Sequence, residues 1–294
     1  MRVLFTIAHY FNSEGGGFYG SLKSDPTPRI KALQGCIAAL HQNFSTFQGM
    51  LDGSARRILP SNTKLSYDID VVVCTNGENH LLYELDGIAH LFTHHTAFVV
   101  EPMLLGFECH EIMSTCYGQY DYYAYLEDDL QIDDPYFLEK IKWFNTNCGD
   151  EFLLQPNRYE VDMVQPMRKL YIDGNLVNPE MTKSIQDVTD SAEISREYLG
   201  APLRFGRVNN PHSGCFFLNN EQLKRWIDQP YFLDRDTSFA GPLESAATLG
   251  ITKAFKIYKP LAENAAFLEI RHLCNRYLGV RIRADHDGKW RIYS

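Results

Sequence analysis

The sequence predicts a mixed α/β fold in which a mostly parallel sheet is flanked by helices. Apolar, strand-like runs alternate with helix-like stretches over the first ~130 residues, which favours parallel strand pairing. The run IDVVVCT is apolar without interruption, as is typical of a strand covered on both faces of its sheet. We expect one domain over residues 1–294, with a sheet-forming half at 1–135 and a looser half at 136–294.

The first half supplies four predicted strands and the helices between them. The strand-like runs lie at residues 3–8, 69–75, 96–100 and 120–126. Pro28 stands at the start of a predicted helix, because apolar residues recur after it at three- and four-residue spacing up to Phe44. Further helical stretches are predicted at 81–92 and 104–119.

The second half has a weaker pattern. Residues 155–210 look mostly like loops, with polar stretches and several Pro and Gly residues. Regular structure is expected again from residue 215. We predict a strand at 215–219, a helix at 220–228 and a helix at 242–250 that begins at Pro242. A second strand at 254–260 and a last element at 267–278, either helix or strand, follow.

The composition excludes several classes of protein. Hydrophobic residues make up 45% and charged residues 22%, a balance that argues against a disordered chain or a fibrous repeat. The net charge of −9 argues against a nucleic-acid-binding surface, and the absence of an 18-residue apolar run argues against a transmembrane segment. Seven scattered cysteines without a CxxC pair, and an N-terminus without an export signal, lead us to expect a cytoplasmic protein without disulfides or structural zinc.

Three consecutive acids, Glu127-Asp128-Asp129, follow the fourth predicted strand directly. Ligands of open α/β sheets bind at the carboxyl ends of the strands, where unpaired carboxylates would repel each other. A divalent cation with oxygen ligands relieves this repulsion and is able to hold a diphosphate. The alternative is a solvated acidic turn that caps the helix expected near Pro135.

The segment YLEDDLQIDDPYFLEKI resembles the metal-binding segment of GT-A glycosyltransferases, and most closely the Glu-Asp-Asp form of the N-acetylglucosaminyltransferase I type. The resemblance implies transfer of a sugar from a nucleotide sugar, expected to be a UDP-sugar, to a glycan or other hydroxyl acceptor. It also implies a Mn²⁺ or Mg²⁺ cofactor. By resemblance, Asp129 coordinates the metal directly, Asp128 binds it through water or contacts the donor ribose, and Glu127 contacts the sugar or its waters.

The same resemblance implies a nucleotide-binding set at the ends of the first two strands. Ala8, His9 and Tyr10 match the positions that hold the base, and Asn76 matches a position that contacts base or ribose. Arg29, in the first helix, is expected to reach a phosphate. The alternatives are that His9 and Tyr10 pack under the Gly-rich loop and that Asn76 only forms a turn.

The acceptor half contains a candidate general base. Inverting transfer requires a group that takes the proton of the acceptor hydroxyl, and Glu244 follows Pro242 in the first turn of a predicted helix. Asp234 and Asp236 are rival bases, and a Glu at this position is also a common partner of the helix dipole. Gly214 is expected to let the backbone approach the donor sugar, or else to punctuate the chain before a strand.

Histidines supply the remaining metal candidates. By resemblance to GT-A enzymes, His272 is a further metal ligand, and the alternative is a buried histidine whose hydrogen bonds are satisfied. His90, His94 and His95 have ligand spacing on a predicted helix, but no acid accompanies them, and we expect surface histidines.

Two other functions use the same residues. A non-catalytic carbohydrate- or calcium-binding module would use the acids of EDDLQIDD and the abundant tyrosines, although the acids do not fit an EF-hand loop. A nucleotidyltransferase would carry a Gly-rich, basic loop after the first strand, and GGGFYGSLK matches this pattern imperfectly.

Overall fold

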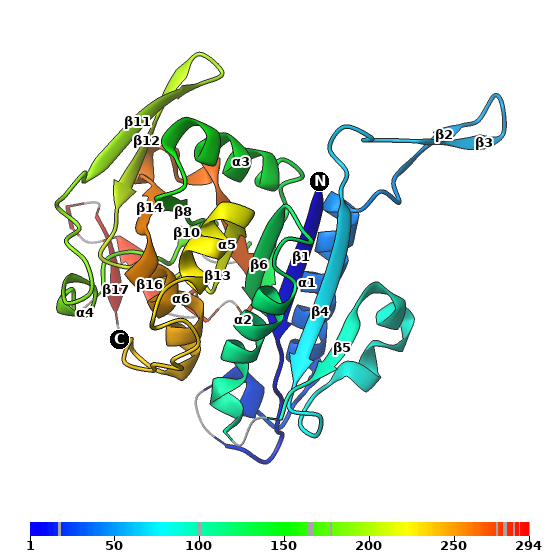
Figure 1. The fold of residues 1–294 in the computed structure, drawn as a ribbon, viewed down its shortest axis with the longest axis horizontal. Helices are drawn as coiled ribbons and strands as arrows, with labels where there is room; N and C mark the ends of the chain where they lie inside the picture. Colours follow the sequence, from blue (N-terminus) through cyan, green and yellow to red (C-terminus); the bar gives the residue numbers. More distant parts are fainter. Residues whose placement is uncertain are drawn as a thin grey trace.

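The computed structural model describes residues 1–16, 19–98, 101–163, 167–176, 178–274, 276–278, 281–284, 286–287 and 289–293 (Figure 1). Its α-helices are α1 (Thr27–Phe44), α2 (Leu105–Thr115), α3 (Phe137–Cys148), α4 (Glu180–Lys183), α5 (Asn220–Ile227) and α6 (Pro242–Ala254). Short 3₁₀ helices are η1 (Gly20–Leu22), η2 (Leu82–Leu91), η3 (Pro102–Leu104) and η4 (Ala262–Phe267). Among the described residues, no helix combines the length and the apolar content needed to cross a bilayer.

The central sheet has five strands in the order β13-β6-β1-β4-β5. Its strands are β1 (Arg2–Ala8), β4 (Asp68–Thr75), β5 (Thr93–Thr96), β6 (Tyr122–Glu127) and β13 (Cys215–Asn219). β1 runs parallel to β4 and β6, β4 runs parallel to β5, and β13 is antiparallel to its neighbour β6. The predicted mixed α/β architecture, with a mostly parallel sheet between helices, is confirmed.

Helices cover both faces of this sheet because its inner strands are apolar on both sides. Val3, Phe5 and Ile7 of β1 pack into a core with α1 and α3, whereas Leu4 points to the opposite core, which contains α2, α5 and α6. This alternation is the two-residue period of a strand. It fixes the end of β1, and therefore the residues that follow Ala8, between two helical layers.

The second half is more regular than the sequence indicates. Residues 155–210 were predicted to be mostly loop-like, and fewer than half of the described ones lie in regular structure, but they also form the strands β9, β10, β11 and β12 and helix α4. One four-stranded sheet has the order β10-β9-β15-β7 and another the order β11-β12-β14-β8. Their strands are β7 (Leu130–Gln131), β8 (Phe152–Leu154), β9 (Asn157–Val161), β10 (Lys169–Tyr171), β11 (Glu193–Tyr198), β12 (Ala201–Arg207), β14 (Lys256–Pro260) and β15 (Glu269–His272).

The missed strands are polar. β9 with β10 and β11 with β12 form local antiparallel pairs, and one strand of each pair also has a distant partner. β9 pairs with β15 and β12 with β14, across long separations in sequence that local pattern does not reveal. The last predicted element, at 267–278, contains strand β15 at Glu269–His272. A terminal hairpin, β16 (Arg281–Ala284) with β17 (Trp290–Tyr293), was not predicted either.

Two further predictions in the first half need correction. The third strand is β5 at Thr93–Thr96, not 96–100, and of the predicted run residues 99–100 lie outside the described residues. His94 and His95 therefore lie on a strand and not on a helix, and both are exposed. The stretch predicted as helical at 81–92 forms the 3₁₀ helix η2, with a non-helical residue at Leu85.

A hairpin that the sequence analysis did not identify projects from the domain (Figure 1). It consists of β2 (Gly49–Asp52) and β3 (Arg57–Pro60), which form a two-stranded sheet of their own. Its large apolar side chains are exposed, namely those of Met50, Leu51 and Ile58.

Candidate functional site

The carboxyl ends of β1 and β6 meet at the centre of the sheet. Ala8 pairs with Glu127 in the parallel register, so His9 and Asp128 are the next residues of adjacent strands. The Nδ1 atom of His9 lies 2.6 Å from Oδ2 of Asp128, and both side chains are buried. The backbone N–H of Leu81 donates to Nε2 of His9, which places the ring proton of a neutral imidazole on Nδ1, pointing at Asp128.

Arg29 neutralises the two aspartates. It lies in the first turn of α1, and its guanidinium donates to Oδ1 of Asp128 and, at 2.9 Å, to Oδ2 of Asp129. Both carboxylate oxygens of Asp128 are therefore occupied by protein partners. Burial favours the neutral acid at Asp129, but Arg29 and then His272 outweigh it and hold the pKa of Asp129 well below its usual range.

The C-terminal part of the chain completes this cluster. β15 pairs with β7, with His272 opposite Leu130, and the N–H of Leu273 donates to the backbone carbonyl of Asp129 at 2.9 Å. These hydrogen bonds bring the side chains of His272 and Cys274 close to the carboxylate of Asp129. Nε2 of His272 lies 3.7 Å and Sγ of Cys274 3.0 Å from Oδ2 of Asp129.

Glu160 orients His272. Its Oε1 lies 2.8 Å from Nδ1 of the imidazole, and its Oε2 accepts the backbone N–H groups of Tyr277 and Leu278. The pKa of His272 is raised because these carboxylates, Glu160 before Asp129, outweigh burial. With Nδ1 bonded to Glu160, Nε2 is the nitrogen available toward Asp129, as in histidines that bind metals.

The residues present fit a metal ion. One donor atom each of Asp129, His272 and Cys274 lies within 4.8 Å of the others. Oδ1 of Asp129 is also buried without a hydrogen-bond partner among the described residues. Burying a carboxylate oxygen without a hydrogen-bond donor destabilises the folded state unless another group binds that oxygen. A cation is able to bind it. The sequence-predicted metal pair, Asp129 and His272, is thus brought together, and its role stays a prediction.

Glu127 has a different environment from the two aspartates. Its N–H donates to the carbonyl of Gly214 at 2.8 Å, and its carboxylate lies 4.0 Å from Arg158 and 3.8 Å from Nε2 of His212. Burial raises the pKa of Glu127 to about 7, against the opposing effect of Arg158. Glu127 is thus poised to hold or release a proton near neutral pH.

Gly214 makes room for Glu127. Its φ is +63°, and a Cβ atom there would stand 2.5 Å from Oε2 of Glu127. The structure therefore gives a local reason for this glycine besides the predicted approach to a donor sugar.

Behind Glu127 lies a buried charge network that the sequence analysis missed. Asp173 accepts from Arg158 and from Lys259, each at 2.9 Å, and Lys259 also donates to the carbonyl of His212 at 2.7 Å. Although burial opposes it, the two cations lower the pKa of Asp173 to about 2. Arg158 lies on β9, Lys259 on β14 of the other small sheet, and Asp173 two residues after β10, so no local motif predicts this network.

The remaining predicted residues have other surroundings. Tyr10 is half-buried against the core of α2, and Oδ1 of Asn76 accepts the N–H of Asn79 at 2.9 Å in a turn. Glu244 lies in the first turn of α6, and its charge contributes to the raised pKa of Glu127. The rival bases Asp234 and Asp236 both pair with a lysine, Lys253.

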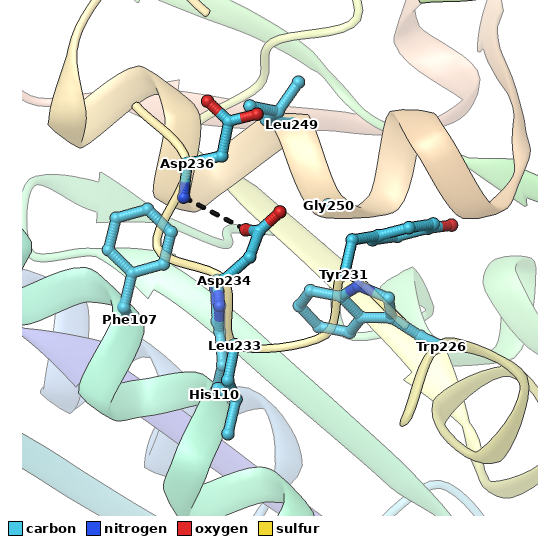
Figure 2. Close-up of a pocket in the computed structure, with 9 residues that line it drawn as sticks. All are labelled: Phe107, His110, Trp226, Tyr231, Leu233, Asp234, Asp236, Leu249 and Gly250. Carbon is cyan, nitrogen blue, oxygen red and sulfur yellow. Dashed lines mark hydrogen bonds between the residues drawn. The ribbon is translucent and has the colours of Figure 1, made fainter. Parts of the chain in front are cut away.

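Two cavities differ in what they are able to admit. The one between α2, α5 and α6, lined by Phe107, His110 and Trp226 among others (Figure 2), has a volume of about 10 Å³, room for about one water. The other, of about 500 Å³, opens beside the start of α1 and is lined by Thr27, Pro28 and Leu273 among others. These residues adjoin Arg29, His272 and Cys274 in the chain, so the ligand-sized cavity borders the acidic cluster.

Comparisons with known proteins give faint likenesses. No protein-family model and no curated protein matches the chain. Among solved structures, S. aureus TarS 1-349 in complex with UDP is similar with a TM-score of 0.43 and 9% identity, over 92% of this chain and 60% of that chain. The longer S. aureus TarS structure has a TM-score of 0.43 and 9% identity, over 92% of this chain and 36% of that chain. TarS 1-349 in complex with UDP-GlcNAc has a TM-score of 0.40 and 12% identity, over 94% of this chain and 62% of that chain. This chain thus spans less than two thirds of each, and likeness at this level assigns neither fold nor activity.

Replacing Gly214 tests the close packing against Glu127. We expect Gly214→Ala to lower the free energy of unfolding more than Gly118→Ala does. Gly118 has a similar φ of +81°, but a methyl group there would meet nothing within 4 Å, so it reports the backbone cost alone, about 1–2 kcal/mol. The clash at Gly214 should add about 1–3 kcal/mol, measured by urea unfolding. Equal losses in the two variants would contradict this account.

The raised pKa of Glu127 predicts a pH-dependent stability. Between its ordinary value of 4.5 and its folded value of about 7, the folded chain keeps a proton that the unfolded chain has released, so this contribution to stability is lost as the pH rises through 7. We expect Glu127→Gln to match the wild type near pH 4.5 and to exceed its free energy of unfolding above pH 7 by on the order of 1–3 kcal/mol. Exposed Glu197→Gln is the control, and a difference independent of pH would refute the prediction.

Proposed function

We propose that this chain is a metal-dependent glycosyltransferase of the GT-A type. It transfers a sugar from a nucleotide sugar, expected to be a UDP-sugar, to a hydroxyl group of a glycan or other acceptor. One observation carries the proposal: Asp128 and Asp129, at the carboxyl edge of a mostly parallel sheet, are joined there by His272 from a strand more than a hundred residues away in sequence. This edge is where open α/β sheets bind their ligands.

In this proposal, Asp129 and His272 hold the Mn²⁺ or Mg²⁺ ion. When bound, the ion offsets the negative charge that develops on the leaving nucleoside diphosphate. Asp128 is a positioning residue, because His9 and Arg29 occupy both of its oxygens. Arg29 keeps Asp129 ionised and remains the candidate for contact with a phosphate.

The donor nucleotide is proposed to bind where β1 and β4 end, at Ala8, His9, Tyr10 and Asn76. The cavity of about 500 Å³ has the size of an ordinary small-molecule site, but it is lined by the start of α1, Gln131 and Leu273 and not by these four residues. Glu127 and Gly214, which contact each other, are proposed to contact the donor sugar.

Glu244 is proposed as the general base. As the acceptor hydroxyl oxygen forms its bond to the anomeric carbon, its proton passes to the Glu244 carboxylate, and the bond from that carbon to the diphosphate breaks. The rivals Asp234 and Asp236 are engaged by Lys253, which favours Glu244.

A nucleotide and metal panel tests the donor class. We expect UDP with Mn²⁺ to raise the melting temperature, since a ligand at a hundred times its Kd stabilises by about 2.7 kcal/mol, and Asp129→Asn to abolish that rise. Asp228→Asn is the matched control, because Asp228 is exposed and pairs with a helix neighbour, Lys224. A rise with Ca²⁺ or free glycans, and none with any nucleotide, would favour a non-catalytic binding module instead.

Glu244→Gln tests the general base. We expect kcat, measured as UDP released from a panel of UDP-sugars, to fall by about 10²–10⁴-fold while stabilisation by UDP and Mn²⁺ persists. Glu221→Gln, which removes the same charge from the first turn of α5, should leave kcat unchanged. An unaltered kcat in Glu244→Gln would remove this residue from the mechanism.

A further inference from the structure

The thiol of Cys274 lies inside the acidic cluster. Its Sγ is 3.0 Å from Oδ2 of Asp129, and the backbone bond between Leu273 and Asp129 holds the segment there. His272 lies on the other side of Leu273, with Nε2 at 3.7 Å from the same oxygen. A carboxylate, an imidazole and a thiol thus converge on one point, from two segments fixed by strand pairing.

An independent observation indicates that a ligand belongs at this point. Asp129 is 8% exposed, yet its Oδ1 has no hydrogen-bond donor among the described residues. Every other carboxylate oxygen of Asp128 and Asp129 is bonded to His9, Arg29 or Cys274. The orphaned oxygen therefore belongs to the same side chain that His272 and Cys274 approach.

The charges around Asp129 are those a cation would meet. Arg29 donates to both aspartates, so a divalent cation beside them would face a guanidinium charge as well. The carboxylates of Asp128, Asp129 and Glu160, the last bonded to His272, offset that charge. The site therefore carries enough negative charge to admit a divalent ion, and the thiol adds a donor of a different kind.

We infer that Cys274 is a third protein ligand of the metal ion, together with Asp129 and His272, and that the site prefers transition ions such as Zn²⁺ and Co²⁺ to Mg²⁺. On binding, the S–H bond breaks, the sulfur–metal bond forms and the proton leaves to solvent. Sulfur ligands select softer ions, whereas Mg²⁺ takes oxygen ligands. The inference rests on the metal site of the proposed function and favours Mn²⁺ over Mg²⁺ for the transfer.

The observed distances are close to those of a bound ion. On a tetrahedral zinc, ligand lengths of about 2.0–2.3 Å place nitrogen and oxygen donors about 3.4 Å apart, and sulfur and oxygen donors about 3.6 Å apart. The distance from His272 to Asp129 is 3.7 Å and that from Cys274 to Asp129 is 3.0 Å. Binding therefore requires the Cys274 side chain to rotate away from Asp129 and the three donor atoms, which lie within 4.8 Å of one another, to come into the closer spacing of a bound ion.

Cobalt titration of the full chain, without nucleotide, tests the inference. We expect Co²⁺ to produce the near-ultraviolet charge-transfer absorption of a thiolate–cobalt bond. Cys274→Ser should remove this absorption and weaken Co²⁺ binding at least about tenfold. Cys148→Ser is the matched control, since Cys148 is a partly exposed cysteine on α3 outside the cluster. Excess Zn²⁺ should displace Co²⁺, and Mg²⁺ should not.

A second measurement uses the unaltered chain. Cys274 is exposed, but burial of its thiol and the neighbouring Asp129 raise its pKa, so alkylation at alkaline pH followed by mass spectrometry should modify it, and Zn²⁺ should protect it. Binding of Co²⁺ that depends on Asp129 but gives neither charge-transfer absorption nor protection would overturn the role of Cys274 and leave the proposed metal site intact. Absence of any Co²⁺ or Zn²⁺ binding would overturn both, and stabilisation by UDP without metal would then still support a nucleotide-sugar enzyme.

Discussion

The repulsion among three consecutive carboxylates at the buried end of β6 is the constraint on which the rest of the site depends. The chain relieves it differently at each position. Asp128 is paired with His9 and Arg29, Asp129 with Arg29 and His272, and Glu127, whose pKa is raised to about 7, is able to carry a proton. Adjacent acids thereby acquire distinct charges, so one strand end carries both ionised carboxylates and a carboxyl group whose pKa lies near neutrality.

These compensating partners come from widely separated parts of the chain. Arg29 is carried by α1, His272 by β15, and Glu160, which orients His272, by β9. The small sheet β10-β9-β15-β7 is therefore more than a cover for the central sheet. Its register decides which C-terminal side chains reach Asp129, so the geometry of the site and the stability of that sheet are linked.

The elements predicted correctly from the sequence are those that a local residue pattern specifies. The parallel sheet and helix α1 follow from apolar runs and three- and four-residue spacing, and the position of Asp129 at a strand end follows from the strand before it. The polar strands at 155–210 lack the apolar runs that marked the central sheet, although β11 and β12 form a local hairpin, and β12 has a distant second partner in β14. Arg158, Asp173 and Lys259 come from separate segments of the chain and carry no shared motif, while His272 and Asp129 were named together only through a family resemblance.

The projecting β2–β3 hairpin gives the chain an uneven resistance to proteases. An isolated two-stranded hairpin is marginally stable in water, so its backbone opens at a small fraction of the free energy needed to unfold the central sheet. Arg56 and Arg57 lie at its turn and are exposed. Trypsin therefore meets two adjacent cleavage sites there, and a nick at this position severs the chain between α1 and β4 without entering either core.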